Sequence, residues 1–378
     1  MDIDAPTPLL GGLSPQTFMR RHWQRRPLLV RQAFPGGLPL IDRRALFALA
    51  ARDDVESRLV RRAHDGRWRL RHGPMPRLPP LREPHWTLLV QGLDLHVAAA
   101  HELLLGFRFV PDARLDDVML SYASDGGGVG PHVDSYDVFL LQTEGRRRWR
   151  VSHQRELGCV PDLPLKILRC FEPEREWLLE PGDMLYLPPG WAHDGIAEGA
   201  CMTASIGFRA PRRAALARDV LQRWLDAAEA DEEGPLYRDA GVAATREPAR
   251  LPAALAAYAQ DAVTRLLAEP GGVACALGES LTEPKPHVVF EAAMFAGMPG
   301  GVRLDRRSRM MYDDDFVFIN GESFRATGRD GRLLRRLADR RGLNARELAL
   351  LGDSARDGVL DWVAAGWLQA TDDGGFDG

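Results

Sequence analysis

Two histidines and one aspartate provide the strongest chemical signal in this sequence. His132 and Asp134 are separated by one residue, and His193 follows much later in the chain. On extended backbone, residues at i and i+2 point to the same side, as a chelating pair must. Two imidazoles and one carboxylate occupy one face of an octahedral metal ion and leave the opposite face open. Non-haem Fe(II) oxygenases use this donor set, so we expect the three residues to be Fe(II) ligands.

The local sequence around these residues distinguishes them from chance matches. A lone His-x-Asp is a weak signal, and a single histidine is more often part of a core. Here the glycine-rich run 126–131 precedes His132 and predicts a loop that ends where a strand begins. The run 181–193 predicts a turn, a strand and a tight Pro-Pro-Gly turn that brings His193 inward. Two independent contexts therefore supply the ligands.

The same two contexts resemble known motifs. The segment 182–193 matches the second cupin motif, and the segment 126–134 matches the first, with aspartate in place of the usual second histidine. The runs 130–139 and 145–149 resemble the JmjC-type ribosomal oxygenases. More narrowly, they are similar to the bacterial branch that hydroxylates an arginine of a large-subunit ribosomal protein. The resemblance extends over nearly the whole chain.

This resemblance implies an Fe(II)- and 2-oxoglutarate-dependent protein hydroxylase. Its expected reaction is 3-hydroxylation of an arginine in a large-subunit ribosomal protein, with 2-oxoglutarate and O₂ as cosubstrates and succinate and CO₂ as products. Three protein ligands leave three positions on the metal, two for a bidentate 2-oxo acid and one for O₂. The resemblance also implies a homodimer. The iron would carry the oxidation while the protein orients the substrate and excludes water.

A 2-oxo acid with a distal carboxylate needs a cation at the far end of its pocket. A guanidinium offers such a carboxylate two parallel donors. Arg146, Arg147 and Arg148 begin a predicted strand, and alternation places Arg147 on the opposite face from its neighbours. The resemblance selects Arg147 as the 2-oxoglutarate arginine. It also places Ser121 and Thr203 near the cosubstrate, although inward serines and threonines are common in β cores.

A cationic substrate side chain predicts an acidic or aromatic cradle beside the metal. Asp125, Tyr136 and Asp137 are the nearest candidates in the sequence. Aspartates at turns are also ordinary capping residues, so this assignment depends on the substrate being an arginine.

Composition is that of an intracellular enzyme. The chain has 378 residues, enough for two or three domains, and a net charge of −4 that does not favour general nucleic-acid affinity. Its four cysteines lack metal-knuckle spacing, which favours reduced thiols in a cytoplasm. The N-terminal residues show no signal-peptide pattern, and no apolar run approaches membrane-spanning length.

We expect an α+β chain of three regions. Residues 1–210 contain many short predicted strands with Gly/Pro turns, as a barrel or sandwich requires. The resemblance makes this region a JmjC/cupin double-stranded β-helix. Ser14 and Pro15 predict the start of its first helix.

Residues 211–300 should be helical, with amphipathic segments at 212–229 and 251–267, and the resemblance makes them a dimerisation region. Residues 301–378 have the strand and helix order of a winged-helix-like domain. The arginines between 332 and 341 could contact phosphates, but a solvated helix face is the preferred interpretation because Asp313–Asp315 would repel a duplex. No direct nucleic-acid binding is therefore expected.

Other functions stay open at this stage. The target could be a histidine, or the reaction could be demethylation of methyl-lysine. A cupin enzyme that does not use 2-oxoglutarate is a further alternative, although such enzymes mostly use more histidines. A non-catalytic binding module would have no need for an intact ligand triad. The fold alone does not decide between these classes.

Overall fold

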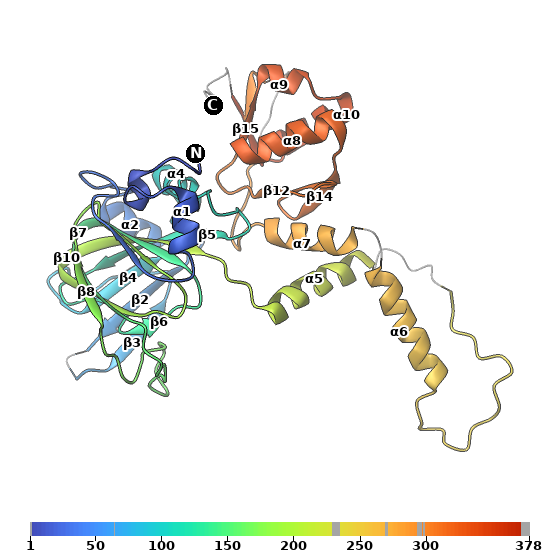
Figure 1. The fold of residues 1–378 in the computed structure, drawn as a ribbon, viewed down its shortest axis with the longest axis horizontal. Coiled ribbons are helices and arrows are strands. Elements are labelled where there is room, and N and C mark those ends of the chain that lie inside the picture. Colours follow the sequence, from blue (N-terminus) through green and yellow to red (C-terminus); the bar gives the residue numbers. More distant parts are fainter. Residues whose placement is uncertain are drawn as a thin grey trace. The chain divides into compact units, whose positions relative to one another are not determined.

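The computed structural model divides the chain into two compact units, residues Met1–Ala210 and Pro211–Gly378 (Figure 1). The described residues are 2–63, 65–228, 235–268, 271–292, 297 and 299–371. The two units are treated separately below.

The first unit is built on one ten-stranded sheet whose strand pairs are all antiparallel. The strand order is β1-β9-β7-β10-β5-β4-β2-β3, with β6 paired to β10 and β8 paired to β7. The strands are β1 (Leu28–Val30), β2 (Ser57–Arg62), β3 (Trp68–His72), β4 (Trp86–Val90), β5 (Leu115–Ala123), β6 (His132–Val133), β7 (Val138–Ser152), β8 (Arg175–Leu179), β9 (Met184–Leu187) and β10 (Ala192–Phe208).

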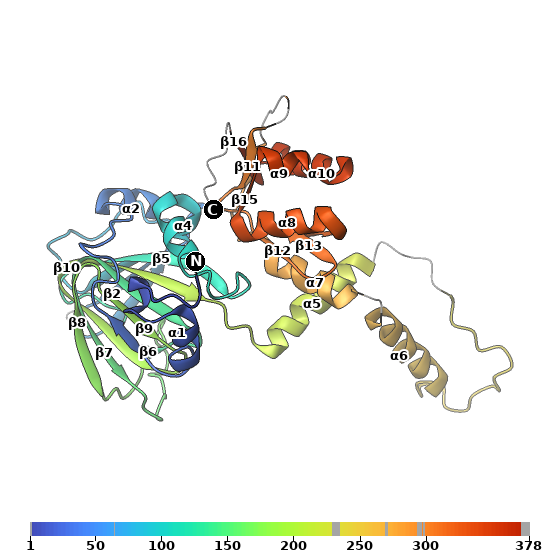
Figure 2. The same ribbon diagram turned by 45° about the horizontal axis from the view of Figure 1, so that its top comes forward.

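The long strands β7 and β10 give the sheet its curvature. They pair with each other along most of their lengths, with a register shift between Glu198 and Met202. A bulge of this kind bends a strand and increases its twist. Gly145 lies at the same bend with φ 65°, and a Cβ there would be 2.3 Å from the carbonyl oxygen of Ala200. The sheet therefore curls around a cavity instead of lying flat (Figure 2).

Short helices pack against this sheet, and a core rich in aromatic side chains lies between them and the strands. The helices are η1 (Pro8–Leu10), α1 (Pro15–Arg21), α2 (Arg43–Ala50), α3 (Leu93–His96) and α4 (Ala98–Leu105). The expected start of the first helix is confirmed, because Ser14 Oγ accepts a hydrogen bond from the Thr17 amide at 3.2 Å. Phe18 on α1 is fully buried and packs edge-on against Tyr186 of β9.

Most of these strands are predicted from the sequence, but two are predicted in pieces and two were overlooked. The sequence predicts separate strands at 138–142 and 147–152, which form the single strand β7, and strands that begin at His193 and at 202, which form the single strand β10. β2 and β4 were not predicted. All five residues of β4 are buried, and a short apolar run that is buried on both faces lacks the alternation that marks a strand.

The second unit begins with helices and ends in a small mixed domain. Its helices are α5 (Arg213–Ala228), α6 (Ala253–Leu267), α7 (Gly272–Thr282), α8 (Gly328–Arg340), α9 (Ala345–Ala349) and α10 (Asp353–Ala364). Its strands are β11 (Gly301–Leu304), β12 (Met310–Tyr312), β13 (Phe316–Ile319), β14 (Glu322–Arg325), β15 (Gly342–Asn344) and β16 (Leu368–Thr371). They form two three-stranded sheets, β15-β11-β16 and β12-β13-β14.

Helix α7 joins the helical region to the mixed domain and was not predicted. It contacts α5 and also β12, β13 and β14. Gly278 lets it approach β13 closely, because a Cβ there would be 2.5 Å from the ring of Phe318. The expected boundary at residue 300 therefore does not separate two bodies in this structure.

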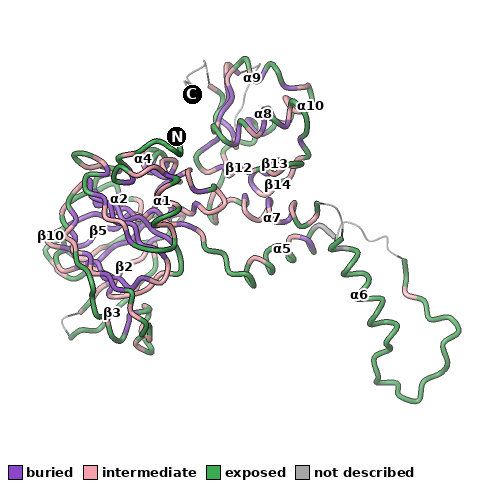
Figure 3. The backbone as a smooth tube through the Cα atoms, in the orientation of Figure 1, coloured by how far each residue is buried: buried purple, intermediate pink, exposed green. Residues whose placement is uncertain are grey.

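Helix α6 stands out from the rest of the second unit by its exposure, as Figure 3 shows. Its apolar side chains Leu255, Val263 and Leu267 are 36%, 56% and 44% exposed. None of the helices that the structure describes combines the length and apolar character needed to cross a membrane.

Candidate metal centre

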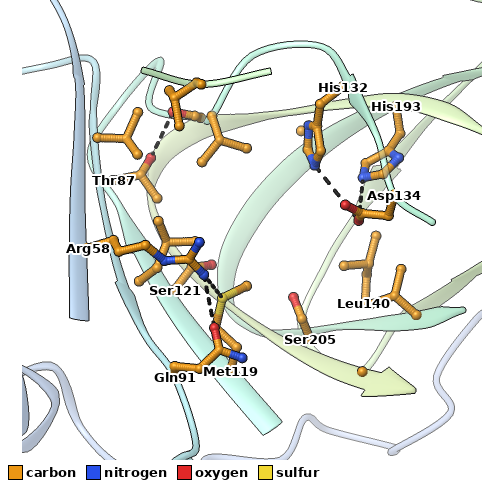
Figure 4. A pocket seen from close by; sticks show the side chains of 18 of the residues that line it. Arg58, Thr87, Gln91, Met119, Ser121, His132, Asp134, Leu140, His193 and Ser205 are labelled. Atoms are coloured by element: carbon orange, nitrogen blue, oxygen red, sulfur yellow. Dashed lines mark hydrogen bonds and ion pairs between the residues drawn. The ribbon is translucent and has the colours of Figure 1, made fainter. Parts of the chain in front are cut away.

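The structure brings His132, Asp134 and His193 together at one end of the cavity (Figure 4). Asp134 Oδ2 lies 3.9 Å from His132 Nε2 and 3.6 Å from His193 Nε2. One ligand atom from each residue lies within 4.8 Å of the others. His132 on β6 is directly opposite His193 on β10 in the strand register. Residues that are far apart in the sequence thus present two nitrogens and one oxygen to a common point.

Backbone carbonyls fix the orientation of both imidazole rings. His132 Nδ1 lies 2.8 Å from the Gly130 oxygen, and His193 Nδ1 lies 3.0 Å from the Trp191 oxygen. With Nδ1 as the donor, Nε2 keeps its lone pair for a metal. Burial, together with the charge of neighbouring His132, lowers the pKa of His193 to about 4. The ring is therefore neutral at physiological pH, which is the form that binds a metal.

Glycines allow the ligand strands to approach each other closely. Gly128 precedes the ligands, and a Cβ at this position would be 2.6 Å from the Gly195 carbonyl oxygen. Gly190 ends the Pro-Pro-Gly turn with φ 82°, and its amide donates to the Asp134 carbonyl oxygen at 3.0 Å. The turn before His193 is thus tied to the loop that carries Asp134.

A cavity of about 340 Å³ opens beside the three ligands and contains Arg147. Arg147 is only 5% exposed, and its Nη1 donates to Ser121 Oγ at 3.3 Å. Among the described residues, its Nε and Nη2 have no hydrogen-bond partner, and neither does Trp149 Nε1 in the same cavity. A buried charged group without partners is costly to maintain, so these donors suit an anionic ligand.

The two hydroxyl-bearing residues expected near the cosubstrate lie in different environments. Ser121 lines the cavity and contacts Arg147. Thr203 is fully buried, does not line the cavity, and its hydroxyl donates to Gln142 Oε1 at 3.0 Å. Thr203 is therefore a structural residue of β10 here, because its hydroxyl is occupied within the sheet.

Of the three residues expected to cradle the substrate, only Tyr136 lines the cavity. Desolvation, reinforced by the charge of Asp134, raises the pKa of Tyr136, whose hydroxyl donates to that carboxylate. Asp125 lies outside the cavity and accepts a hydrogen bond from the Gly199 amide at 2.8 Å. Asp137 is fully buried in the core, where it accepts from Tyr186 at 2.6 Å and from Gln24 at 3.0 Å. These two aspartates thus have structural roles in this fold.

Several cavity residues were missed by the sequence reasoning. They are Arg58 from β2, Gln91 after β4, Asp116 and Asp117 on β5, and Lys166. Arg58 Nη2 donates to Gln91 Oε1 at 2.9 Å (Figure 4), and Gln91 Nε2 donates to Asp117 Oδ2 at 2.6 Å. Arg58 and Gln91 come from or follow strands that had not been predicted, Asp116 and Asp117 lie at the start of β5, and Lys166 lies in the loop between β7 and β8. The adjacent acids Asp116 and Asp117 just before a predicted strand were the available signal.

Comparison with known families identifies the class of this fold. Residues 102–216 match the JmjC domain, and residues 265–369 match the ROXA-like winged helix. The crystal structure of Escherichia coli YcfD superposes with a TM-score of 0.79 at 31% identity, covering 94% of this chain and 97% of that one. The chain belongs to the JmjC-domain family, in the branch that also carries a ROXA-like winged helix. The first unit is accordingly a double-stranded β-helix, as expected.

Two further comparisons name particular relatives. The ribosomal protein uL16 3-hydroxylase of Escherichia coli strain K12 is 41% identical over 237 residues, which span 61% of each chain. A structure of the ribosomal oxygenase YcfD from Escherichia coli in complex with cobalt and 2-oxoglutarate superposes with a TM-score of 0.77 at 30% identity. It covers 94% of this chain and 98% of that one.

Proposed function

We propose that this protein is an Fe(II)- and 2-oxoglutarate-dependent protein hydroxylase. One observation carries the proposal: a buried arginine with unpaired donors shares a cavity with a His-Asp-His set. A dicarboxylate can satisfy both features at once, by chelating the metal with its 2-oxo acid end and by pairing with Arg147 at its distal carboxylate. The YcfD structure with cobalt and 2-oxoglutarate supports this arrangement.

Each group in the cavity has a defined part in the reaction. His132, Asp134 and His193 hold Fe(II), which supplies the oxidation of an unactivated C–H bond with 2-oxoglutarate and O₂ as cosubstrates. Arg147 and Ser121 fix the distal carboxylate of 2-oxoglutarate. Leu140, Trp149 and other apolar side chains of the cavity exclude water from the reacting centre.

The substrate that we propose is an arginine of a large-subunit ribosomal protein, hydroxylated at its 3-position. The name of the Escherichia coli relative gives uL16 as its substrate. Asp116 and Asp117 add to the support, because they give the cavity two carboxylates besides the ligand Asp134. An arginine side chain needs such a partner for its guanidinium, whereas a neutral histidine does not.

The test is turnover on the ribosomal proteins of the host. The Fe(II)-loaded protein is incubated with 2-oxoglutarate, air and purified large-subunit proteins, and succinate and peptide masses are measured. We expect one added oxygen on an arginine peptide of uL16, and none with His132→Ala. Succinate without any mass gain would overturn the substrate. No succinate from the iron-loaded protein would overturn the activity and favour the other cupin chemistries.

We further propose that the protein is a homodimer through α5 and α6 and acts in the cytoplasm, where its ribosomal substrate would be found. Leu221 and Leu225 on α5 are 48% and 54% exposed, and α6 carries a further exposed apolar set. A second copy would bury these side chains. For the winged helix we propose a scaffold role, because Arg336 and Arg340 both pair with Glu347 inside that domain.

A further inference from the structure

The hairpin of β2 and β3 concentrates positive charge that the whole-chain charge conceals. Residues 57–85 contain eight arginines against two acidic residues, a formal charge of +6. The whole chain carries −4, so the remaining residues carry −10. The expectation of no nucleic-acid binding considered the net charge of the chain and Asp313–Asp315 of the winged helix, and not this hairpin. Binding depends on where the charge lies, and here it lies on one edge of the catalytic sheet.

Within this hairpin the structure forms a hollow of about 140 Å³ lined by guanidinium groups. Its charged walls are Arg61 and Arg62 of β2, Arg69 of β3, and Glu83 and His85 from the segment that follows. Arg61 and Arg69 are directly opposite each other in the strand register. Like charges at such positions destabilise a sheet pair unless an opposite charge compensates them.

One carboxylate supplies only part of that compensation. Glu83 forms an ion pair with Arg61. Arg62 lies 5.7 Å above the ring of Trp68, and no carboxylate pairs with Arg62 or Arg69 among the residues that the structure describes. Three arginines therefore line a hollow whose lining contains one acid, Glu83, with Arg61 and Arg69 on one face of the hairpin and the Arg62 guanidinium over Trp68. Charges on an edge strand commonly guard against aggregation, but that role does not require a shared hollow.

The hollow lies beside the catalytic machinery. Arg58 and Val60 of β2 and Leu70 of β3 line the metal cavity from the face of the hairpin opposite to Arg61 and Arg69. His85, on the rim of the hollow, has its Nδ1 3.2 Å from the carbonyl oxygen of Gly126, at the start of the glycine loop that leads to the metal ligands. An anion bound in the hollow would thus be held next to the entrance loop of the site.

We propose that this hollow binds a phosphodiester of RNA, so that the hairpin β2–β3 docks the catalytic unit on ribosomal RNA beside its protein substrate. Guanidinium groups bind phosphate oxygens with two parallel donors, and neutralised phosphates release counterions. The choice of RNA over an acidic peptide rests on the proposed function, because the partner of a ribosomal protein is RNA.

The test is fluorescence anisotropy of a short labelled RNA with the full-length protein across a salt series. The double variant Arg62→Gln/Arg69→Gln should bind on the order of tenfold more weakly. The slope of log K against log salt should fall by about 0.7, since the hollow holds one phosphodiester and each phosphate contact with a single strand contributes roughly 0.7. Glu83→Gln should bind a few-fold more tightly, because it releases Arg61.

A matched control removes the same charge elsewhere in the catalytic unit. Arg43→Gln/Arg44→Gln changes two exposed arginines at the start of α2 and should bind RNA like the wild type. Arg62→Lys/Arg69→Lys keeps the charge and should retain most of the affinity, which also shows that the hairpin folds. Equal weakening by both glutamine pairs would overturn the site, as would wild-type protein that does not bind RNA.

Two further outcomes separate this proposal from the proposed function. Poly-glutamate and anionic vesicles are added at the same concentration of negative charge as the RNA. If either displaced the RNA, the choice of RNA as the ligand would be wrong. Succinate formation on a free peptide substrate should be unchanged in Arg62→Gln/Arg69→Gln. If the wild type bound RNA but showed no turnover on the peptide, the proposed hydroxylase activity would be wrong and the proposed RNA site would remain.

Discussion

Arg147 of the catalytic unit and two arginines of the second unit differ in how their guanidinium donors are partnered. In the catalytic unit, Arg147 is buried with two of its donor nitrogens unpaired among the described residues. In the second unit, Arg336 lies 2.8 Å from Glu347, and Arg341 donates to the carbonyl oxygens of Asp305 and Ser308. A paired arginine stabilises its fold, whereas an unpaired buried arginine costs free energy until a ligand arrives. The contrast identifies Arg147 as a residue suited to binding an anionic ligand.

Loss of the metal should have the largest effect, and only in the catalytic unit. Asp134→Asn keeps the size of the side chain but removes the charged metal ligand, so we expect succinate formation to fall more than about 100-fold. Iron content after dialysis should fall with it. Asp125→Asn is the control and should keep both, because Asp125 lies outside the cavity. More than a tenth of the wild-type turnover in Asp134→Asn would contradict the ligand assignment.

The second-largest effect should come from removing the unpaired donors of Arg147, which should weaken 2-oxoglutarate binding. One charge-assisted hydrogen bond is worth about 1.5–3 kcal/mol, so losing even one of the two that Arg147 would make, as in Arg147→Ala, should raise the KM for 2-oxoglutarate by about 10- to 150-fold. Arg148→Ala provides the matched control, since Arg148 pairs with Glu176 and Glu198 on the other face of β7. If both variants raised the KM equally, Arg147 would have no special role in binding the cosubstrate.

Mutations in the second unit should change the stability of that unit and leave turnover unchanged. Leu337 on α8 is fully buried in that unit, and Leu337→Ala should lower its free energy of unfolding by about 3 kcal/mol. The melting transition of this unit should shift while turnover on a free peptide stays constant. Leu350→Ala, at a residue that is 52% exposed, should shift it little. Lost peptide turnover in Leu337→Ala would show that the second unit does more than support.

The smallest effect should come from the paired charges of the second unit. Partial burial raises the pKa of Glu347, but the hydrogen bonds from Arg336 and from the Asn344 backbone outweigh it and lower that pKa below 4.5. Glu347→Gln should therefore cost about 1 kcal/mol at neutral pH. The difference from wild type should shrink as the pH falls below 4.5, where the carboxylate becomes protonated in both states. A difference that is independent of pH would instead point to the capping role of Glu347.

The sequence predicted the site better than the cavity around it. His132, Asp134 and His193 stand in local patterns of turn and strand, and such patterns survive without knowledge of the tertiary structure. Arg58 and Asp117 reach the cavity only because β2 and β5 become near neighbours in the sheet, which no short-range pattern encodes. Asp137 shows the converse error, since its nearness in sequence to the ligands concealed that its side chain faces the aromatic core.

Backbone pairing of β6 with β10 places His132 opposite His193 in the strand register. Strand pairing and the apolar core therefore offset the entropic cost of closing the long loop between these histidines, and metal coordination is not needed for this. In small zinc domains the opposite holds, and the metal is what folds the chain. In this protein we expect the barrel to stay intact when the metal is removed, so that a chelator produces a folded apoprotein that can be reloaded.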